Sequence, residues 1–461
     1  MAIVNRLINK VFVLMLENRS YDNVFGWSDL KGFTPEGVAT QADGLIGKPL
    51  FTNRDRSGNL HTVGAGASFQ MPFDPGHEFS DVLLALCGAN TVSTANCVAD
   101  TARITGAYPA PAASANDFGF AACLEDHGFD TALGLRAFTP DQLPVLNFLA
   151  QQFAVCDRWF SSMPGPTWPN RFFALAGTSW GLDHSPSDLS TFASNFLNAA
   201  RFGNGRDSVL TLLPSDAWMV VDGDSPQSWA LAGVERYPQN FVHLADFLPQ
   251  LAEPGALHPR FIFIEPAYDA LSLNHFRSGN SMHPLGDVRR GEMLIKTLYE
   301  AIKSSPYWEQ SAFVILFDEH GGFFDHVVPP TCVPPAPPTD DDLNRHGLRF
   351  DRYGFRVPAI VVSPYVRQAT IDHTVYDHTS LLKTLNGLLS PAQSLLTTAR
   401  VNAANSFERL FTLNVPRHRD DIAPCPAPVP LPADAAAALA NVGTGRSIGA
   451  FQTLPTYRGQ A

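Results

Sequence analysis

Five ionisable side chains lie within nine residues of the segment FVILFDEHGGFFDHVVPP. Asp318, Glu319 and His320 directly follow an apolar run, and Asp325 and His326 come after two glycines. Glycines allow close backbone approach, and ionisable side chains beside a buried run are typical of a metal site or of acid/base chemistry. An acidic tight turn with two hydrogen-bonded histidines is the alternative that these residues leave open.

A carboxylate and an amide follow the first apolar run of the chain, in LMLENRSYDNVFG. The run ends at Glu17 and Asn18, so a carboxylate oxygen and an amide oxygen would lie side by side. Hard divalent cations bind oxygen ligands of this kind. The alternative is a turn at a strand end, capped by Asn18, Ser20 or Asp22.

A hydroxyl group lies among prolines in SSMPGPTWPNRFFALAG. Three prolines and Gly165 hold Thr167 in a stiff turn, and a helix is expected to start near Asn170. A hydroxyl at a helix N-terminus, with its pKa lowered by the dipole and by a metal ion, is suited to accept a phosphoryl group. Arg171 could grip a phosphate, and Asn170 could donate a neutral hydrogen bond. The alternative is an ordinary proline-rich turn in which Thr167 caps the helix.

Three isolated histidines complete the candidates: His77 in FDPGHEFSD, His283 in NSMHPLGDV and His378 in YDHTSLLKTL. Isolated histidines serve in packing or capping more often than in catalysis. The residues alone therefore assign none of the three to a site.

Four apolar runs predict the strands that would position these side chains. Each run is nearly continuous in apolar residues and stops at a polar one, as a buried parallel strand does. The runs are 11–16, 261–264, 312–317 and 359–362, and the residues that end them are Glu17, Glu265, Asp318 and Ser363. Ligands of parallel α/β sheets bind beyond the carboxyl ends of the strands, so the acidic residues would meet at that edge.

Helical patterns lie between and after these runs. Leu294, Leu298 and Ile302 are four residues apart within 288–303, and 376–388 also has a helical pattern. Strands that alternate with helices predict an α/β fold. We expect a doubly wound, mostly parallel sheet with helices on both faces and long loop insertions over the active site.

The rest of the chain is assigned to an insertion and a tail. Residues 32–122 are weakly periodic and rich in Gly, Asp, Asn and Thr, which predicts a long insertion that could cover the site as a lid. The catalytic domain is expected to span 1–415. A Pro/Ala-rich tail, packed on this domain or extending from it, would follow at 416–461, with a short helix at 435–440.

The composition excludes several classes of protein. A content of 45% hydrophobic and only 16% charged residues excludes a disordered chain. The formal net charge of -12 gives little attraction to phosphate backbones, so nucleic acid is not expected as a partner. The run at 11–16 is far shorter than the roughly 20 residues that span a bilayer, so no transmembrane segment is expected.

The apolar run at 11–16 also indicates whether the chain starts with a signal peptide. It ends in Glu17 and Asn18 without a small-residue cleavage site, so no signal peptide is expected. The localisation is therefore open between the cytoplasm and a signal-independent route of secretion. Six cysteines are too few for a disulfide scaffold, and Cys87 and Cys97 are the expected local pair.

Six motifs follow one another along the chain: LENRSYDNVFG, GPTWPNRFF, MHPLGDVRRGEMLIKTLYEAIKSSPYW, FDEHGGFFDHVVPP, GFRVPAIVVSPYV and YDHTSLLKTL. Together they resemble the phosphoesterase family that contains bacterial and plant phospholipases C of the non-haemolytic type and a branch of acid phosphatases. The resemblance runs from about Val11 to about Leu388. The family is a distant relative of alkaline phosphatase, which implies the same doubly wound α/β fold.

The resemblance also implies a site. One divalent metal ion, with Zn, Ca or Mn as plausible identities, would be bound by Glu17, Asn18, Thr167, Asp318 and Glu319. Thr167 would be the nucleophile. The remaining implied catalytic residues are His77 and His283 at the phosphate and Asp325 and His326 in the same pocket. By their chemistry, His283 or His77 suits the general acid, and Asn170 and Arg171 suit the non-bridging oxygens.

Three functions remain open at this point. The first is a phospholipase C that cleaves the glycerol-side phosphodiester of a phospholipid such as phosphatidylcholine, through a phosphothreonine intermediate and with transient contact to a membrane surface. Thr167 favours this branch, because the phospholipase-like members of the family resemble this chain in using threonine, whereas the acid phosphatase branch uses serine. The second is an acid phosphatase that acts on small phosphomonoesters. The third is an inactive lipid-binding or interaction protein, against which the intact Thr167, Asp318 and Glu319 argue.

The basic and aromatic residues of these motifs indicate which kind of substrate the site would accept. The motifs offer Arg171 but no further basic residue beside the acidic cluster, which favours a diester over a monoester dianion. Four phenylalanines could line an apolar entrance for acyl chains or belong to an ordinary core: Phe172, Phe173, Phe323 and Phe324.

Overall fold

A ten-stranded sheet forms the centre of the protein in the computed structural model, which describes residues 7–88, 110–185, 207–270, 276–335, 343–389 and 395–432. The central strand is β1 (Lys10–Leu16), and all of its residues are buried. Two other apolar strands, β12 (Phe261–Glu265) and β13 (Ser311–Phe317), pair with β1 in parallel on either side. These three predicted strands are therefore confirmed.

The sheet continues outward on both sides of these three strands. Its full order is β11-β10-β12-β1-β13-β14-β8-β15-β2-β3. The outer strands are β11 (Phe241–His243), β10 (Trp218–Asp222), β14 (Ala359–Val362), β8 (Ala154–Cys156), β15 (Thr370–Asp372), β2 (Lys31–Phe33) and β3 (Ala39–Gln41). Most of the pairings are parallel, which confirms the predicted α/β class.

The direction of β14 differs from the prediction. This strand is buried as expected, but it runs antiparallel to both β13 and β8. A parallel pair needs a crossover connection, usually a helix. The described part of the connection from β13 to β14 contains no helix, so the chain returns along the opposite direction. A short apolar run shows burial but carries no information about direction.

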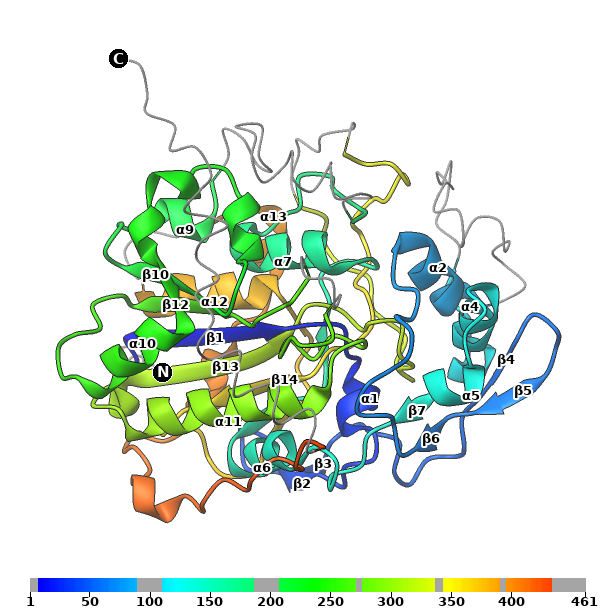
Figure 1. Ribbon diagram of the computed structural model, residues 1–461, viewed down its shortest axis with the longest axis horizontal. Coiled ribbons are helices and arrows are strands. Elements are labelled where there is room, and N and C mark those ends of the chain that lie inside the picture. Colours follow the sequence, from blue (N-terminus) through cyan, green and yellow to red (C-terminus); the bar gives the residue numbers. More distant parts are fainter. Residues whose placement is uncertain are drawn as a thin grey trace.

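Helices cover both faces of the sheet, as predicted. In Figure 1, α7 (Thr167–Ala176) and α12 (Thr379–Leu389) lie above the sheet, and α6 (Pro144–Gln152) and α11 (Val288–Ser304) lie below it. The helix expected at 288–303 is confirmed as α11.

Two helix starts differ from the predictions. The pattern at 376–388 divides, because Tyr376–Asp377 forms the short strand β16, which pairs with β9 (Trp159–Phe160), and α12 starts only after it. Helix α7 starts at Thr167 itself, three residues before the expected Asn170. Pro169 is tolerated there because the N–H groups of a first turn have no partner within the helix.

The predicted insertion at 32–122 is not one body. Its strands β2 and β3 belong to the edge of the main sheet. Its helix α2 (Phe79–Cys87), the hairpin of β4 (Thr52–Arg54) and β5 (Leu60–Thr62), and the following α4 (Phe120–Asp126) lie together at the right of Figure 1. They pack around a second apolar cluster separate from the core of the sheet. A covering role for this lobe stays a prediction.

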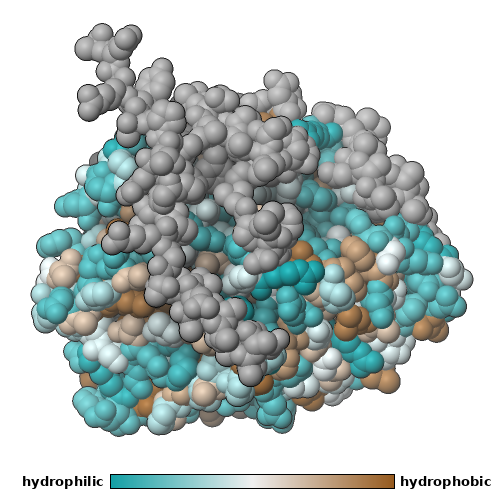
Figure 2. Space-filling view, viewed as in Figure 1, coloured by the Kyte–Doolittle hydropathy of each residue, from teal (hydrophilic) through white to brown (hydrophobic). Residues whose placement is uncertain are grey.

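The surface of the protein is mostly hydrophilic on the face that can be seen, and several predictions concern residues near the chain ends. On the face shown in Figure 2, hydrophilic residues cover most of the coloured surface and apolar residues form smaller patches. Within the described ranges, we find no helix with the length and apolar character needed to cross a bilayer. The helix expected at 435–440 and Cys97 lie outside the described residues, and the boundary at residue 415 stays a prediction.

Candidate active site

Three acidic side chains meet at the carboxyl edge of the central strands. Glu17 follows β1, Glu265 ends β12, and Asp318 follows β13. These strands are parallel neighbours, so their carboxyl ends lie at one edge, where ligands of such sheets bind. All three side chains are buried.

Glycines permit the close contact between the loops at this edge. Asn18 has a φ of 56°, a left-handed conformation that is uncommon outside glycine. Gly321 has a φ of 64°, and a Cβ atom there would lie 2.1 Å from the carbonyl oxygen of Asn18. A Cβ atom on Gly322 would lie 2.6 Å from the carbonyl oxygen of Gly76. The two glycines of FDEHGG therefore let the loops at 17–18, 76–77 and 318–321 stack against one another.

The four predicted metal ligands at the strand ends differ in how many of their side-chain oxygens accept hydrogen bonds from the protein. Asp318 accepts hydrogen bonds from the backbone N–H of Asn18 and from Nε of Arg171, both at 3.0 Å. Three buried oxygens have no hydrogen-bond partner among the described residues: Glu17 Oε2, Asn18 Oδ1 and Glu319 Oε1. Burial raises the pKa of Glu17 and that of Glu319 to about 7. Unpartnered buried oxygens of this kind suit a hard divalent cation.

The predicted metal set is not preformed in this arrangement. Asp318 directs both oxygens toward protein donors, and Glu319 Oε2 accepts from the N–H of Gly321 at 2.7 Å. Across the described ranges, the groups of three carboxylate, imidazole or thiol ligands that already lie within 4.8 Å of one another are elsewhere. They are Asp81 with Cys123 and His127, and Asp22 with Asp325 and His326.

Thr167 lies in a cleft of about 350 Å³ together with both predicted phosphate histidines, His77 and His283. It is the first residue of α7 and follows the N-cap Pro166. Neither lysine nor arginine occurs among the described residues that line this cleft. The other lining residues are Glu17, Asp74, Pro75, Gly76, Glu78, Asp81, His127, Trp168, Ser185, Gln227 and Phe276.

Asn170 and Arg171 bind protein groups instead of lining the cleft. Nδ2 of Asn170 donates to the carbonyl oxygens of Gly165 and Pro166 at 3.0 Å, which fixes the turn that presents Thr167. Nη1 of Arg171 donates to the Tyr268 hydroxyl at 2.7 Å, and its Nε bonds to Asp318. Both residues are buried. A direct contact of either with phosphate stays a prediction that this arrangement does not support.

The two cleft histidines lie near one carboxylate, Asp74, and Nδ1 of His77 is 4.0 Å from its Oδ1. Nδ1 of His77 donates to the carbonyl oxygen of Pro75 at 2.7 Å, and Nε2 of His283 lies 3.4 Å from Asp74. Burial lowers the pKa of His77, but the carboxylates of Glu319 and Asp74 outweigh it and raise that pKa to about 10. His283 stacks on Phe276, with ring centroids 3.9 Å apart.

The Asn18 amide faces His77 through its NH₂ group, with Nδ2 3.1 Å from Nε2. This orientation suits a neutral ring, because Nε2 must then accept. A protonated ring instead requires the amide to turn its oxygen toward Nε2.

Asp325 and His326 are not brought together with Thr167. Asp325 accepts from Nε of Arg356 at 2.9 Å, and Nδ1 of His326 lies 2.5 Å from Asp22. Nη2 of Arg356 donates to Asp22 at 2.9 Å, so these four residues form one buried ionic network. None of them lines the cleft, and their predicted catalytic roles stay untested predictions.

His378 has a supporting position that the sequence did not reveal. Its Nδ1 accepts from Nε1 of Trp159 at 3.3 Å, so its Nε2 carries the proton and donates to the carbonyl oxygen of Asp318 at 2.6 Å. The neutral ring thus holds the loop that follows β13.

Several cleft and network residues escaped the sequence reasoning. Asp74 lies three residues before His77 in FDPGHE, a proximity that could have indicated it. The sequence predicts Glu265 at this edge but assigns it no role, and its side chain accepts a hydrogen bond from the Tyr268 hydroxyl at 2.7 Å. Gln227, which donates to Glu17 at 3.2 Å, has no local signal in the sequence.

The possibility of an apolar entrance formed by phenylalanines is not supported. The alternative, an ordinary core, is confirmed for Phe172, Phe173, Phe323 and Phe324, because all four are buried and none lines the cleft. The aromatic residues that do line it are Trp168 and Phe276.

Comparisons with known proteins match this chain to one family model and to proteins named phospholipase C. A family model described as the Phosphoesterase family matches residues 8–207 and 228–389. Non-specific phospholipase C3 of Arabidopsis thaliana is 29% identical over 420 residues, which cover 89% of this chain and 74% of that protein. Non-specific phospholipase C5 of the same plant is 30% identical over 89% of this chain and 75% of that protein. Phospholipase C B of Mycobacterium tuberculosis is 27% identical over 89% and 78%.

Among solved structures, a protein of the alkaline phosphatase superfamily from Vibrio parahaemolyticus aligns with 57% of this chain and 62% of its own. The TM-score is 0.31 and the sequence identity is 14%. A similarity this low adds nothing to the assignment of the site.

Proposed function

Because this chain belongs to the phosphoesterase family and is a phosphoric ester hydrolase, we propose that it is a phospholipase C that cleaves phosphatidylcholine-like lipids to diacylglycerol and a phosphorylated head group. The names of its plant and mycobacterial relatives support this substrate class. Transient contact with a membrane surface follows from such a substrate.

One observation carries the choice of a diester: Thr167 and two histidines share a cleft whose described lining contains no lysine or arginine. A monoester dianion needs an extra positive charge at its third free oxygen, whereas a diester monoanion mainly needs a proton for its alkoxide leaving group. Arg171, the one cation of the motif, is engaged with Asp318 and Tyr268 behind the cleft. The cleft therefore suits a diester.

In the proposed reaction, the Thr167 hydroxyl loses its proton to solvent, its oxygen attacks phosphorus, and the bond to the diacylglycerol oxygen breaks. His283 or His77 donates a proton to that leaving oxygen, and water then hydrolyses the phosphothreonine to restore the Thr167 hydroxyl. A divalent ion bound by Glu17, Asn18, Thr167, Asp318 and Glu319 would polarise the phosphoryl group and make the hydroxyl a better nucleophile. Asn170 fixes the turn of the nucleophile, Asp74 orients His283, and the carbonyl oxygen of Pro75 orients His77.

A broad acid phosphatase is the second candidate, and one observation favours it. The carboxylates of Glu319 and Asp74 raise the pKa of His77, and a protonated ring there would supply a positive charge that a monoester dianion could use.

The test compares p-nitrophenyl phosphorylcholine with p-nitrophenyl phosphate at one pH and one metal concentration. Our proposal predicts a larger kcat/KM for the choline diester and release of diacylglycerol from phosphatidylcholine vesicles. Thr167→Ala, purified in parallel, controls for contaminating hydrolases. A clear preference for the monoester, without diacylglycerol release, would establish the acid phosphatase instead.

A further inference from the structure

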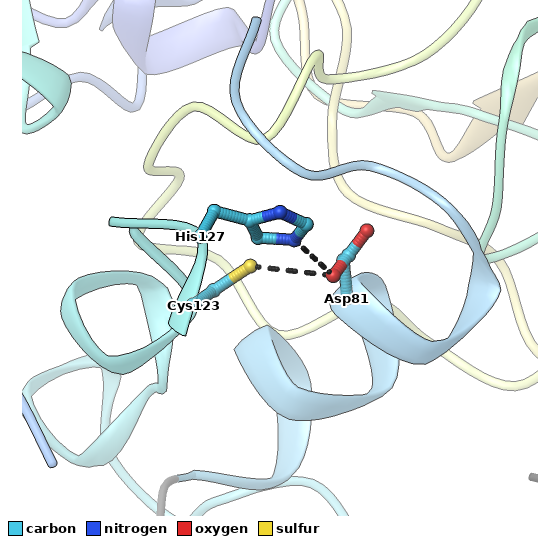
Figure 3. A group of neighbouring side chains, drawn as sticks. All are labelled: Asp81, Cys123 and His127. Atoms are coloured by element: carbon cyan, nitrogen blue, oxygen red, sulfur yellow. Dashed lines mark hydrogen bonds and ion pairs between the residues drawn. The ribbon is translucent and has the colours of Figure 1, made fainter. Parts of the chain in front are cut away.

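A second group of possible metal ligands lies beside the cleft and has no role in the proposed reaction. Asp81 is in the first turn of α2, Cys123 is on α4, and His127 is the C-cap of α4 (Figure 3). Nε2 of His127 lies 2.9 Å from Oδ1 of Asp81, and Sγ of Cys123 lies 3.7 Å from the same oxygen. The three ligand atoms thus converge on one point between the two helices, as Figure 3 shows.

These two separations are within about 0.4 Å of the edges of a tetrahedral zinc site. Zinc binds thiolate sulfur at about 2.3 Å and imidazole nitrogen or carboxylate oxygen at about 2.0 Å. Tetrahedral angles then give an edge of about 3.5 Å between sulfur and oxygen, and about 3.3 Å between nitrogen and oxygen. The observed 3.7 Å and 2.9 Å require only small side-chain adjustments to reach these values.

The chemistry of the three ligands selects the metal. A thiolate and a carboxylate carry two negative charges, which a divalent ion balances, and imidazole binds as the neutral ring. Thiolate combined with imidazole favours zinc over calcium or magnesium, which prefer oxygen. Cys123 and His127 are four residues apart on one helix, a spacing that places both on the same face.

The chain keeps space beside this cluster. A Cβ atom on Gly76 would lie 2.5 Å from Nε2 of His127 and 2.7 Å from Cγ of Asp81. Gly76 belongs to the loop that carries Asp74 and His77 into the cleft. Asp81 and His127 also line that cleft, whereas Cys123 is buried behind them. An ion here would have three protein ligands and a fourth position facing the cleft.

We propose that Asp81, Cys123 and His127 bind one zinc ion, separate from the oxygen-ligand set at Glu17 and Asp318. Binding displaces the thiol proton of Cys123 to solvent and joins α2 to α4 beside the loop at 74–77. The alternative is a hydrogen-bonded trio that holds no metal.

Cobalt substitution of the full-length protein distinguishes the two. The protein is stripped with a chelator and titrated with Co²⁺, and the sulfur-to-cobalt charge-transfer band is recorded in the near ultraviolet. Only a thiolate ligand gives this band, so cobalt at the oxygen-ligand set does not contribute. We expect the band to saturate at one equivalent per chain and to disappear when Zn²⁺ is added.

Variants assign the band to the cluster. Cys123→Ser should abolish it, and Cys425→Ser, which changes a half-buried cysteine within the segment 416–461, should retain it. Zinc affinity should fall by at least about tenfold in Cys123→Ser, since the loss of even an outer-shell partner costs that much. Zinc should raise the Tm of the wild type and of Cys425→Ser by more than that of Cys123→Ser, which keeps only the oxygen-ligand set.

Two outcomes would overturn the site. One is a correctly folded wild type without the band, and the other is an undiminished band in Cys123→Ser. If Cys123→Ser does not fold, as judged by circular dichroism, His127→Gln provides the same comparison, because its half-buried ring lies at the helix end. This variant keeps the thiolate, so its readout is the cobalt concentration at which the band saturates, and a cobalt affinity equal to that of the wild type would count as the second outcome.

Discussion

At the scale of single residues, Thr167 combines three features that a nucleophile needs. It opens α7, it faces the cleft, and its turn is fixed by the buried amide of Asn170. A helix N-terminus stabilises negative charge that develops on an oxygen nearby. The proposed function therefore depends on this one hydroxyl more than on any other group.

Removal of the hydroxyl should abolish turnover while leaving the fold intact. We expect Thr167→Ala to lose on the order of 10³-fold or more in kcat, as other nucleophile deletions do. Thr297→Ala makes the same change on the exposed face of α11 and should keep full activity. Thermal unfolding of both variants checks the fold, and a Thr167→Ala enzyme with more than about a tenth of wild-type kcat would rule out this nucleophile.

The unpartnered oxygens of Glu17, Asn18 and Glu319 lead to a prediction about metal removal. Chelation should abolish hydrolysis, and a divalent ion should restore it, because three buried oxygens would otherwise lack a cation. The Cys123→Ser variant separates this ion from the proposed zinc, since it leaves the oxygen ligands intact. Full activity in extensively dialysed enzyme without any stoichiometric metal would show that these carboxylates serve acid/base chemistry instead.

At the scale of elements, the site depends on how closely the strand-end loops approach one another. The contact between Gly321 and Asn18 joins the loops after β13 and β1. Both residues have positive φ values, and the acidic side chains of Glu17 and Glu319 lie within two residues of them.

A methyl group at Gly321 should disturb this contact. Alanine there meets the Asn18 carbonyl at 2.1 Å, and backbone atoms cannot move away cheaply. Gly58→Ala is the matched control, because Gly58 also has a positive φ but has nothing within 4 Å of the point where a methyl group would lie. We expect Gly58→Ala to cost about 1–2 kcal/mol of unfolding free energy, and Gly321→Ala a further ~1–3 kcal/mol together with most activity. Equal losses in denaturant unfolding would show that the contact is unimportant.

A buried carboxylate between α11 and α6 should make stability depend on pH. Glu292 of α11 accepts from the first-turn N–H groups of Val145 and Leu146 at 2.7 and 2.9 Å. Burial raises its pKa from an ordinary 4.5 to about 8, although the two amides oppose that shift. The stability linked to the protonated group is therefore complete below about pH 4.5 and is lost as the pH rises through 8.

The measurement compares Glu292→Gln with the wild type between those pH values. The wild type should lose stability relative to this variant from pH 4.5 to 8, and the difference should then level off. Glu300→Gln, an exposed change on the same helix, should show no such trend. A constant difference between Glu292→Gln and wild type across this range would contradict the raised pKa.

At the scale of the whole molecule, a buried arginine joins distant parts of the chain. Arg356 bonds to Asp22 and Asp325, and its Nη1 donates to the carbonyl oxygens of Asp43 and Asp157. These partners come from the N-terminal segment, the acidic loop and the region before Thr167. The network therefore positions the loops that carry the cleft without lining it.

Loss of this arginine should destabilise the entire fold. Arg356→Met leaves two buried carboxylates without their cation, which typically costs about 3–5 kcal/mol. Arg54→Met removes an exposed arginine from the β4–β5 hairpin and should change the unfolding free energy little. Denaturant unfolding measures both, and similar small effects would show that Arg356 is not a central support.

The sequence by itself determined the features that local pattern controls. Apolar runs ended by acids gave β1, β12 and β13 and the edge where Glu17 and Asp318 lie, because burial and strand polarity follow from consecutive residues. The proline-rich turn similarly indicated a helix start close to Thr167. The helix begins at Thr167 itself, three residues before the expected Asn170.

Only the tertiary structure decided which distant side chains meet. In the folded protein, β14 runs antiparallel to β13. Arg171 donates to Asp318, and Arg356 donates to Asp325. The tertiary structure also brought Asp81 to Cys123, a pair 42 residues apart, and Asp74 to His283. Such contacts depend on how loops pack over many intervening residues, and the periodicity of a sequence carries no information about those distances.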